Sequence, residues 1–194
     1  MAEEMDKTSS QKGVAPEAPA LAAAERLADE VLFLCTGNFY RSRLAELLFR
    51  HHAEQCGLDW NTDSKGILSK TNHAGLSPSA IAYLEKVGLA EMAALPRDPE
   101  SVKIEDLLRV KLVVALNRIE HEELLRQRFG RIPVELEKLG RLRYWNVFDI
   151  PIRSGWTRIL QWNDNTGSQP ETSGGEHIHF AVQALVSELA RKPC

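Results

Sequence analysis

The sequence has few cysteines, no excess of positive charge and no long apolar run, and each of these absences excludes a class of protein. Its three cysteines, Cys35, Cys56 and Cys194, are too few and too scattered for a disulfide framework or a four-cysteine zinc site. Lysine and arginine total 24 against 27 for aspartate and glutamate, a net charge of −3, so the basic excess of a general nucleic-acid binder is missing. No apolar run approaches the roughly 18 residues of a membrane span, and the acidic start lacks the features of a signal peptide. We therefore expect a cytoplasmic protein that binds neither nucleic acid nor membrane.

The composition that remains is that of one globular domain with extensions. The chain has 194 residues, of which 43% are apolar, as is ordinary for a single folded core. Residues 1–29 are rich in Ala, Glu, Pro and Ser, which predicts a disordered or partly helical tail. The domain is expected over residues 30–192, with a loop insertion at about 153–175 that is too long for a routine connection.

Short apolar runs alternate along the chain with segments of helical periodicity. The first run, residues 31–34, is continuous and apolar, as is typical of a strand buried on both faces. Further strands are predicted at 59–64, 112–116 and 144–148, and helices at 42–56, 77–87, 120–129 and 177–190. Charged runs such as 120–123 are expected to be solvated helix faces. This alternation predicts an α/β fold: a single doubly wound domain with a four-stranded parallel sheet and helices on both faces.

The segment between the first strand and the first helix is the strongest candidate site. At such a junction the helix start offers unpaired N–H groups and a positive dipole end, which favour an anion such as phosphate. The same groups, with the Arg41 guanidinium, would stabilise Cys35 as a thiolate nucleophile, and Ser42 can donate to its sulfur. The alternative is a buried cysteine that acts as a small apolar residue. The predicted phosphate loop after Cys35 consists of Thr36, Gly37, Asn38, Phe39, Tyr40, Arg41 and Ser42.

Residues 31–46, which contain this loop, resemble the signature of the low-molecular-weight protein tyrosine phosphatase family. Residues 63–66, 73–78 and 113–117 resemble further landmarks of that family. The resemblance implies hydrolysis of phosphate monoesters in two steps, without metal or cofactor, on a phosphorylated protein or a small phosphomonoester.

The resemblance also implies roles for individual residues. Cys35 would be the nucleophile that becomes phosphocysteine, and Arg41 and the loop amides would hold the phosphoryl group. Asn38, Ser42 and Ser64 would brace the loop. An aspartate after the fourth strand would act as general acid and then as general base, and Asp149 is the residue expected there.

Three departures from the family pattern bear on these roles. The family usually has the acidic Asp directly before Pro, whereas Ile150 separates Asp149 from Pro151. Tyr40 stands where a second loop cysteine is common, so a disulfide within the loop is ruled out. Arg43 replaces a usual Pro and is expected to add positive charge at the mouth of the site.

Two alternatives remain beside a protein tyrosine phosphatase. If Ile150 displaces the acid, the loop would serve a phosphate-binding pseudo-phosphatase that captures phosphorylated partners. The same scaffold also supports arsenate reductases, which need further thiols near the nucleophile. Cys56 lies about 21 Å beyond the helix start at roughly 1.5 Å per residue, so Cys194 alone could serve in that chemistry.

Overall fold

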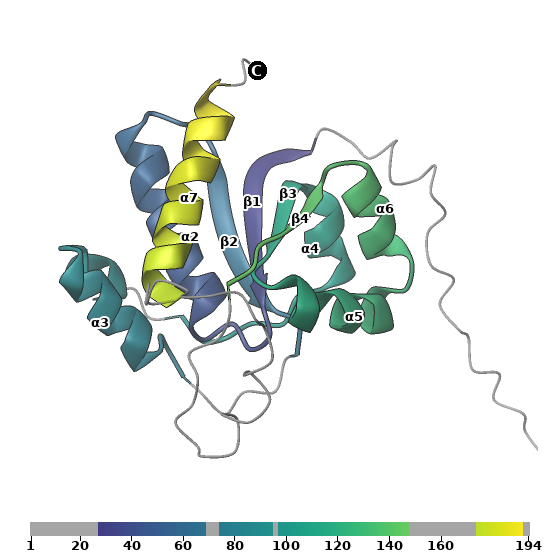
Figure 1. The fold of residues 1–194 in the computed structure, drawn as a ribbon, viewed down its shortest axis with the longest axis horizontal. Coiled ribbons are helices and arrows are strands. Elements are labelled where there is room, and N and C mark those ends of the chain that lie inside the picture. Colours follow the sequence, from purple (N-terminus) through teal and green to yellow (C-terminus); the bar gives the residue numbers. More distant parts are fainter. Residues whose placement is uncertain (1–26, 69–73, 95–96, 148–173, 192–194) are drawn as a thin grey trace, which may run out of the picture.

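A single parallel sheet forms the centre of the molecule. The computed structural model describes residues 27–68, 74–94, 97–147 and 174–191 (Figure 1). The strands lie in the order β2-β1-β3-β4, and every neighbouring pair is parallel. They are β1 (Ala28–Cys35), β2 (Asn61–Gly66), β3 (Val110–Ala115) and β4 (Leu142–Tyr144).

Helices cover both faces of this sheet, which confirms the predicted doubly wound fold. The side chains of β1 alternate between the two cores: Val31 and Phe33 pack on one face, Leu32 and Leu34 on the other. Figure 1 shows α2, α3 and α7 on the first face and α4, α5 and α6 on the second. These helices are α2 (Arg41–Gln55), α3 (Pro78–Lys86), α4 (Ile104–Arg109), α5 (Arg118–Phe129), α6 (Ile132–Lys138) and α7 (Gly174–Arg191), and a 3₁₀ helix, η1 (Ala90–Ala94), follows α3.

The fourth strand lies earlier than the predicted 144–148. The β3–β4 register pairs Val113 with Leu142 and Ala115 with Tyr144, after which the regular ladder stops. Trp145 and Val147 still donate backbone N–H groups, to the carbonyls of Ala115 and Leu116, at 2.9 and 2.8 Å. The prediction therefore located a hydrogen-bonded but irregular extension of the strand instead of the strand itself.

Other boundaries differ where the sequence signal is polar or short. β1 begins at Ala28, before the apolar run, because Ala28 already pairs with Val110 of β3. Asp29 and Glu30 also form ion pairs with Lys111 and Arg109. Helices α4 and α6 have only six and seven residues, too few to show a helical period, and were not predicted. Residues 1–26 and 148–173, which hold most of the predicted tail and insertion, lie outside the described residues.

The topology predicts a ligand site at the carboxyl edge of the sheet. Cys35 at the end of β1 pairs with Gly66 of β2, and Leu34 pairs with Ala115 of β3. Since β1 has later strands on both sides, the strand order reverses between β1 and β3, where ligands bind in open α/β sheets. Among the residues that the structure describes, no helix is both long enough and apolar enough to cross a membrane.

Candidate active site

The loop that joins β1 to α2 lies tightly against the end of β2. Backbone N–H groups of Ile67 and Leu68 donate to the carbonyls of Cys35 and Thr36, both at 2.9 Å. A Cβ added at Gly66 would come within 3.1 Å of the Gly37 carbonyl carbon and 3.2 Å of the Thr36 carbonyl oxygen. The loop can therefore approach β2 this closely because residue 66 has no side chain.

Cys35 lies at the base of this loop with two hydrogen-bond partners at its sulfur. The backbone N–H of Asn38 donates to Sγ at 3.2 Å, and Ser42 Oγ lies 3.0 Å from Sγ. Cys35 and Ser42 are both buried, so water competes little for these contacts. These two contacts fix the position of Sγ, the atom expected to act as the nucleophile.

Asn38 braces the loop with both ends of its side chain. Its φ of 53° lies in the left-handed region, which Asn tolerates better than most residues. Its Nδ2 donates to Ser42 Oγ at 3.1 Å and to Ser64 Oγ at 2.9 Å, and its Oδ1 accepts from the Glu100 N–H at 2.9 Å. The structure thus brings together the three residues expected to support the loop, Asn38, Ser42 and Ser64.

A buried carboxylate that the sequence analysis missed stands behind this brace. Glu46 accepts from Ser64 Oγ at 2.7 Å and from the guanidinium groups of Arg97, Arg43 and Arg50 at 2.9, 3.1 and 2.8 Å. The expectation that Arg43 adds charge at the mouth is wrong: the residue is 2% exposed and pairs with Glu46, one turn along α2. The spacing of Glu46, three residues after Arg43 and four before Arg50, was the signal available in the sequence.

Arg97 ties the same network to β2. Besides Glu46, it donates to the Ser64 carbonyl at 2.9 Å and to Asp63 Oδ1 at 2.7 Å. Burial alone would raise the pKa of Asp63, but Arg97, the Ser64 N–H and Lys65 together lower it below its usual value. Asp63 therefore remains a carboxylate that holds Arg97 against the back of the loop.

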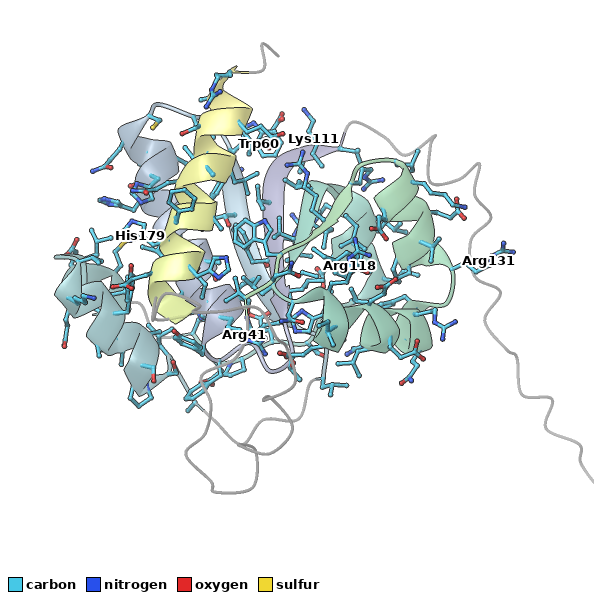
Figure 2. All side chains as sticks on the ribbon, viewed as in Figure 1. Arg41, Trp60, Lys111, Arg118, Arg131 and His179 are labelled. Carbon is cyan, nitrogen blue, oxygen red and sulfur yellow. The ribbon has the colours of Figure 1, made fainter. Side chains whose placement is uncertain are left out.

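Arg41 begins α2 and is held at the carboxyl edge of the sheet. Its side chain is 2% exposed, and it donates to Glu120 Oε2 at 2.8 Å and to the Val147 carbonyl at 3.3 Å. The Val147 carbonyl also accepts from Asn117 Nδ2 at 3.3 Å. Figure 2 shows Arg41 at the opposite end of the sheet from Trp60 and Lys111.

The first turn of α5 contributes to the site, although its sequence predicted a solvated helix face. Asn117 caps the helix by accepting from the Glu120 N–H at 3.1 Å, and Glu120 reaches Arg41. His121 is fully buried, and burial together with the nearby Arg41 lowers its pKa to about 3. Its Nε2 lies 3.4 Å from Thr36 Oγ1. Sequence reasoning missed Glu120 and His121 because both lie in a run of charged residues.

The structure does not place the expected general acid, because Asp149 lies outside the described residues. Trp145 follows β4 and packs against Phe33 with ring centroids 5.7 Å apart, so it belongs to the edge of the core. Phe39 and Tyr40 are the aromatic residues of the loop itself.

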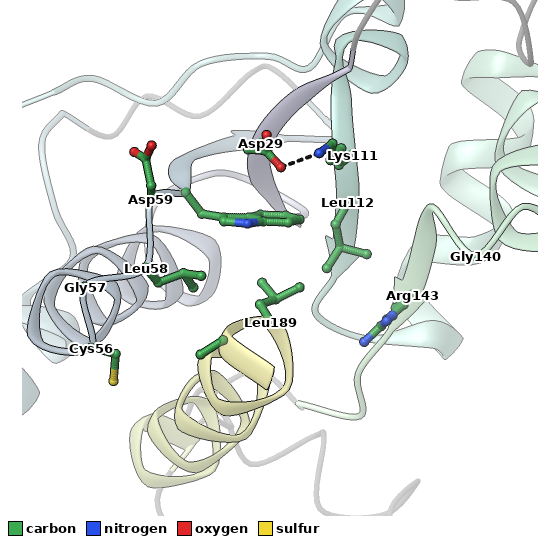
Figure 3. Close-up of a pocket in the computed structure, with 12 residues that line it drawn as sticks. Asp29, Cys56, Gly57, Leu58, Asp59, Lys111, Leu112, Gly140, Arg143 and Leu189 are labelled. Carbon is green, nitrogen blue, oxygen red and sulfur yellow. Dashed lines mark hydrogen bonds and ion pairs between the residues drawn. The ribbon is translucent and has the colours of Figure 1, made fainter. Parts of the chain in front are cut away.

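A cavity of about 570 Å³ lies far from this loop, at the amino edge of the sheet (Figure 3). The cavity is lined by Trp60, Lys111 and the end of α7, and Lys111 forms an ion pair with Asp29, which also lines it. Cys56 also lines the cavity. It lies beyond the end of the 15-residue α2, which spans about 22 Å at roughly 1.5 Å per residue.

In the described part of the chain, no group of three or more His, Cys, Asp or Glu side chains could hold a metal ion.

Comparisons with known proteins identify the family to which this site belongs. Residues 30–147 match the model of a family described as low molecular weight phosphotyrosine protein phosphatase. A protein-arginine-phosphatase of Bacillus subtilis (strain 168) is 31% identical over 102 residues, 53% of this chain and 64% of the relative, so the chain spans less than two thirds of that relative.

Solved structures of bacterial proteins have a similar fold. A crystal structure of a YwlE mutant from Bacillus subtilis has a TM-score of 0.56 and 22% identity, over 84% of this chain and 96% of that one. A low molecular weight phosphotyrosine phosphatase from Vibrio cholerae O395 has a TM-score of 0.59 and 20% identity, over 84% and 97%. At this identity the two structures show the fold alone. The family match over residues 30–147 shows that the chain belongs to the low molecular weight phosphotyrosine protein phosphatase family of hydrolases.

Proposed function

We propose that the chain is a cysteine-dependent, metal-free protein phosphatase that hydrolyses phosphotyrosine through a phosphocysteine intermediate. The observation that carries this proposal is the position of Cys35 Sγ at the carboxyl end of β1. There it accepts from the Asn38 N–H and contacts Ser42 Oγ, with Arg41 at the start of the following helix. A free thiol at this position suits a reducing compartment such as the cytoplasm.

In the first step the Cys35 thiolate attacks phosphorus, and the bond from phosphorus to the leaving oxygen breaks. The fork of Arg41 and the loop amides would hold the phosphoryl oxygens while charge develops on them. The contacts of Arg41 with Glu120 and the Val147 carbonyl fix the direction of the guanidinium before a substrate arrives. Water then attacks phosphocysteine, which releases phosphate and restores the thiol.

Asp149 is the proposed general acid for the first step and the base for the second. Support comes from Val147, whose carbonyl accepts from Arg41 and from Asn117 at the edge of the site. Asp149 follows Val147 by two residues, a stretch of chain that spans at most about 7 Å. A carboxylic acid at this distance could protonate the leaving phenoxide.

The nucleophile is tested by Cys35→Ser. We expect this variant to lose all turnover of an aryl phosphate in metal-free buffer while it keeps the fold, since serine is isosteric but its hydroxyl is not ionised at neutral pH. Acid quenching of the unmutated enzyme with substrate, followed by mass spectrometry, should find the phosphoryl group on Cys35. Activity in the variant, or a phosphoryl group on another residue, would refute the assignment.

The general acid is tested by Asp149→Asn. We expect kcat for a poor leaving group to fall by about 10² to 10⁴, as for other general acid–base residues. An activated aryl phosphate should lose less, because its leaving group needs little protonation. An unchanged rate with the poor leaving group would remove Asp149 from the mechanism.

Phosphoarginine is the second candidate substrate, because the B. subtilis relative at 31% identity is a protein-arginine-phosphatase. The two candidates are separated by kcat/KM for matched peptides that carry phosphotyrosine or phosphoarginine. A preference for the tyrosine peptide of tenfold or more would support the proposal, and the reverse preference would replace it.

Two further alternatives, a pseudo-phosphatase and an arsenate reductase, can be distinguished from a phosphatase by what the protein binds and produces. A phosphate-binding pseudo-phosphatase would bind the phosphopeptide tightly and turn it over negligibly. An arsenate reductase would produce arsenite with consumption of thiol, and of the two cysteines described, Cys56 lies beyond the far end of α2 from the loop. Its distance from Cys35 makes Cys56 unsuitable as the second thiol.

A further inference from the structure

The imidazole of His121 joins two elements on opposite sides of the point where the strand order reverses. It belongs to α5, which follows β3, and it contacts Thr36 in the loop that follows β1. The two residues are 85 positions apart in the chain. His121 is fully buried, so its polar atoms depend on protein partners.

The partners of the ring decide which nitrogen carries the proton. The backbone N–H of Asn117 donates to His121 Nδ1 at 3.1 Å, so Nδ1 must be the unprotonated acceptor. The ring is neutral, because burial and the nearby Arg41 disfavour the cation. Its single N–H is therefore on Nε2.

This tautomer determines what Thr36 can do. The Nε2–H donates to Thr36 Oγ1 at 3.4 Å, whereas Glu120 Oε2 lies farther away, at 3.8 Å. A hydroxyl that accepts one hydrogen bond turns its own hydrogen away from the donor. The Thr36 hydroxyl hydrogen is thus directed away from the imidazole, within a loop whose backbone surrounds Cys35.

We propose that His121 is a positioning residue that makes the Thr36 hydroxyl a hydrogen-bond donor to the phosphoryl group held above Cys35. The proposal rests on the proposed function to the extent that the loop binds phosphate. It assigns a ligand-binding role to a loop side chain and a supporting role to a buried residue of another element. Hydrogen bonds to charged groups are among the strongest, so each contact should have a measurable effect on affinity.

The test is a double-mutant cycle on binding of inorganic phosphate to the full chain, measured by calorimetry. Thr36→Val removes the hydroxyl and is expected to raise the Kd about tenfold, while Thr36→Ser keeps it and should remain near the unmutated value. His121→Leu should raise the Kd by about three- to tenfold. The double variant should bind no more weakly than Thr36→Val, because both changes remove the same hydrogen bond.

Controls separate this role from general damage to α5. Gln127→Leu makes a comparable apolar change at an exposed position of the same helix and should leave the Kd unchanged. His121→Gln retains an amide N–H and should recover part of the affinity lost in His121→Leu. If His121→Leu does not fold, the cycle is run with His121→Gln, and Thr36→Val must still weaken binding.

Each outcome decides for or against the proposal. Multiplicative losses in the double variant, or full affinity in Thr36→Val, would overturn it. If the unmutated chain binds no phosphate, the proposed function fails as well. If it binds phosphate and the two side chains make no difference, only this inference fails. The rate of Cys35 alkylation by iodoacetamide should stay unchanged in all variants, since they leave the contacts of Asn38 and Ser42 with its sulfur in place.

Discussion

At the scale of single residues, the loop depends on one position that carries no side chain. Gly66→Ala would place a Cβ 3.1–3.2 Å from backbone atoms of Thr36, Gly37 and Asn38, which would have to shift by a few tenths of an ångström. Because catalysis needs the loop amides and Cys35 in register, we expect kcat/KM to fall by about tenfold or more. Steady-state kinetics with an aryl phosphate measure the effect.

Gly130→Ala is the matched control for this substitution. Gly130 has a φ of 62° and a ψ of −122° but open space around its missing Cβ, so alanine should cost about 1–3 kcal/mol of stability through backbone strain. It should leave kcat/KM unchanged. Equal losses of activity in the two variants would show that stability, not loop geometry, explains the effect at Gly66.

The residues of the site differ in how far the sequence could reveal them. Cys35, Asn38, Arg41 and Ser42 share one short segment, whose position between an apolar strand and a helix predicts a phosphate loop. His121 could not be found in this way, because its role depends on a contact between residues 85 positions apart.

At the scale of elements, α2 is joined to β2 by the carboxylate of Glu46. Glu46→Gln would remove the negative charge that three arginines and Ser64 share in a mostly buried position. We expect the free energy of unfolding to fall by about 2–3 kcal/mol, since a buried pair that loses one partner leaves uncompensated charge. Urea denaturation at pH 7 measures it.

Glu54→Gln, an exposed change on the same helix, should stay within about 0.5 kcal/mol of the unmutated protein. If Glu46→Gln proves equally mild, the charge network behind the loop has no net role in stability.

The elements themselves were predictable where apolar residues repeat over several positions. The apolar runs of β1 and β3 predicted buried strands, and the sequence around Ser77 and Pro78 predicted the start of α3, where Ser77 accepts from the Ala80 N–H at 3.2 Å. Short elements such as α6 and β4 are set by packing on neighbours, and their local sequence does not reveal them. The misplacement of β4 arose because Trp145 and Val147 are apolar and hydrogen-bonded without being part of the ladder.

At the scale of the whole molecule, buried and half-buried histidines make stability depend on pH. Burial is the largest cause that lowers the pKa of His121, to about 3, and it also lowers the pKa values of the half-buried His52 and His179. The fold disfavours the charged form of these rings, whereas the unfolded chain binds protons as the pH falls below about 6.5. The free energy of unfolding should therefore decrease as the pH falls below about 6.5, and for His121 this loss continues down to about pH 3, at up to about 1.4 kcal/mol per pH unit.

Urea denaturation at pH 7.5, 6 and 5 tests this dependence. The His121→Gln variant should lose less stability on acidification than the unmutated protein, because one protonation of the unfolded state no longer contributes. Parallel pH dependences of the two proteins would mean that His121 is already protonated in the folded state.

The tyrosine at position 40 affects how the protein would respond to peroxide. Peroxide would convert the Cys35 thiolate to a sulfenic acid, and of the described cysteines the other, Cys56, is separated from it by the whole of α2. Because Tyr40 supplies no neighbouring thiol and Cys56 is remote, recovery would depend on Cys194 or on a small thiol from solution, such as glutathione. Oxidative inactivation would then be reversible only as fast as that thiol arrives, and prolonged exposure would carry the sulfur on to its irreversible sulfinic form.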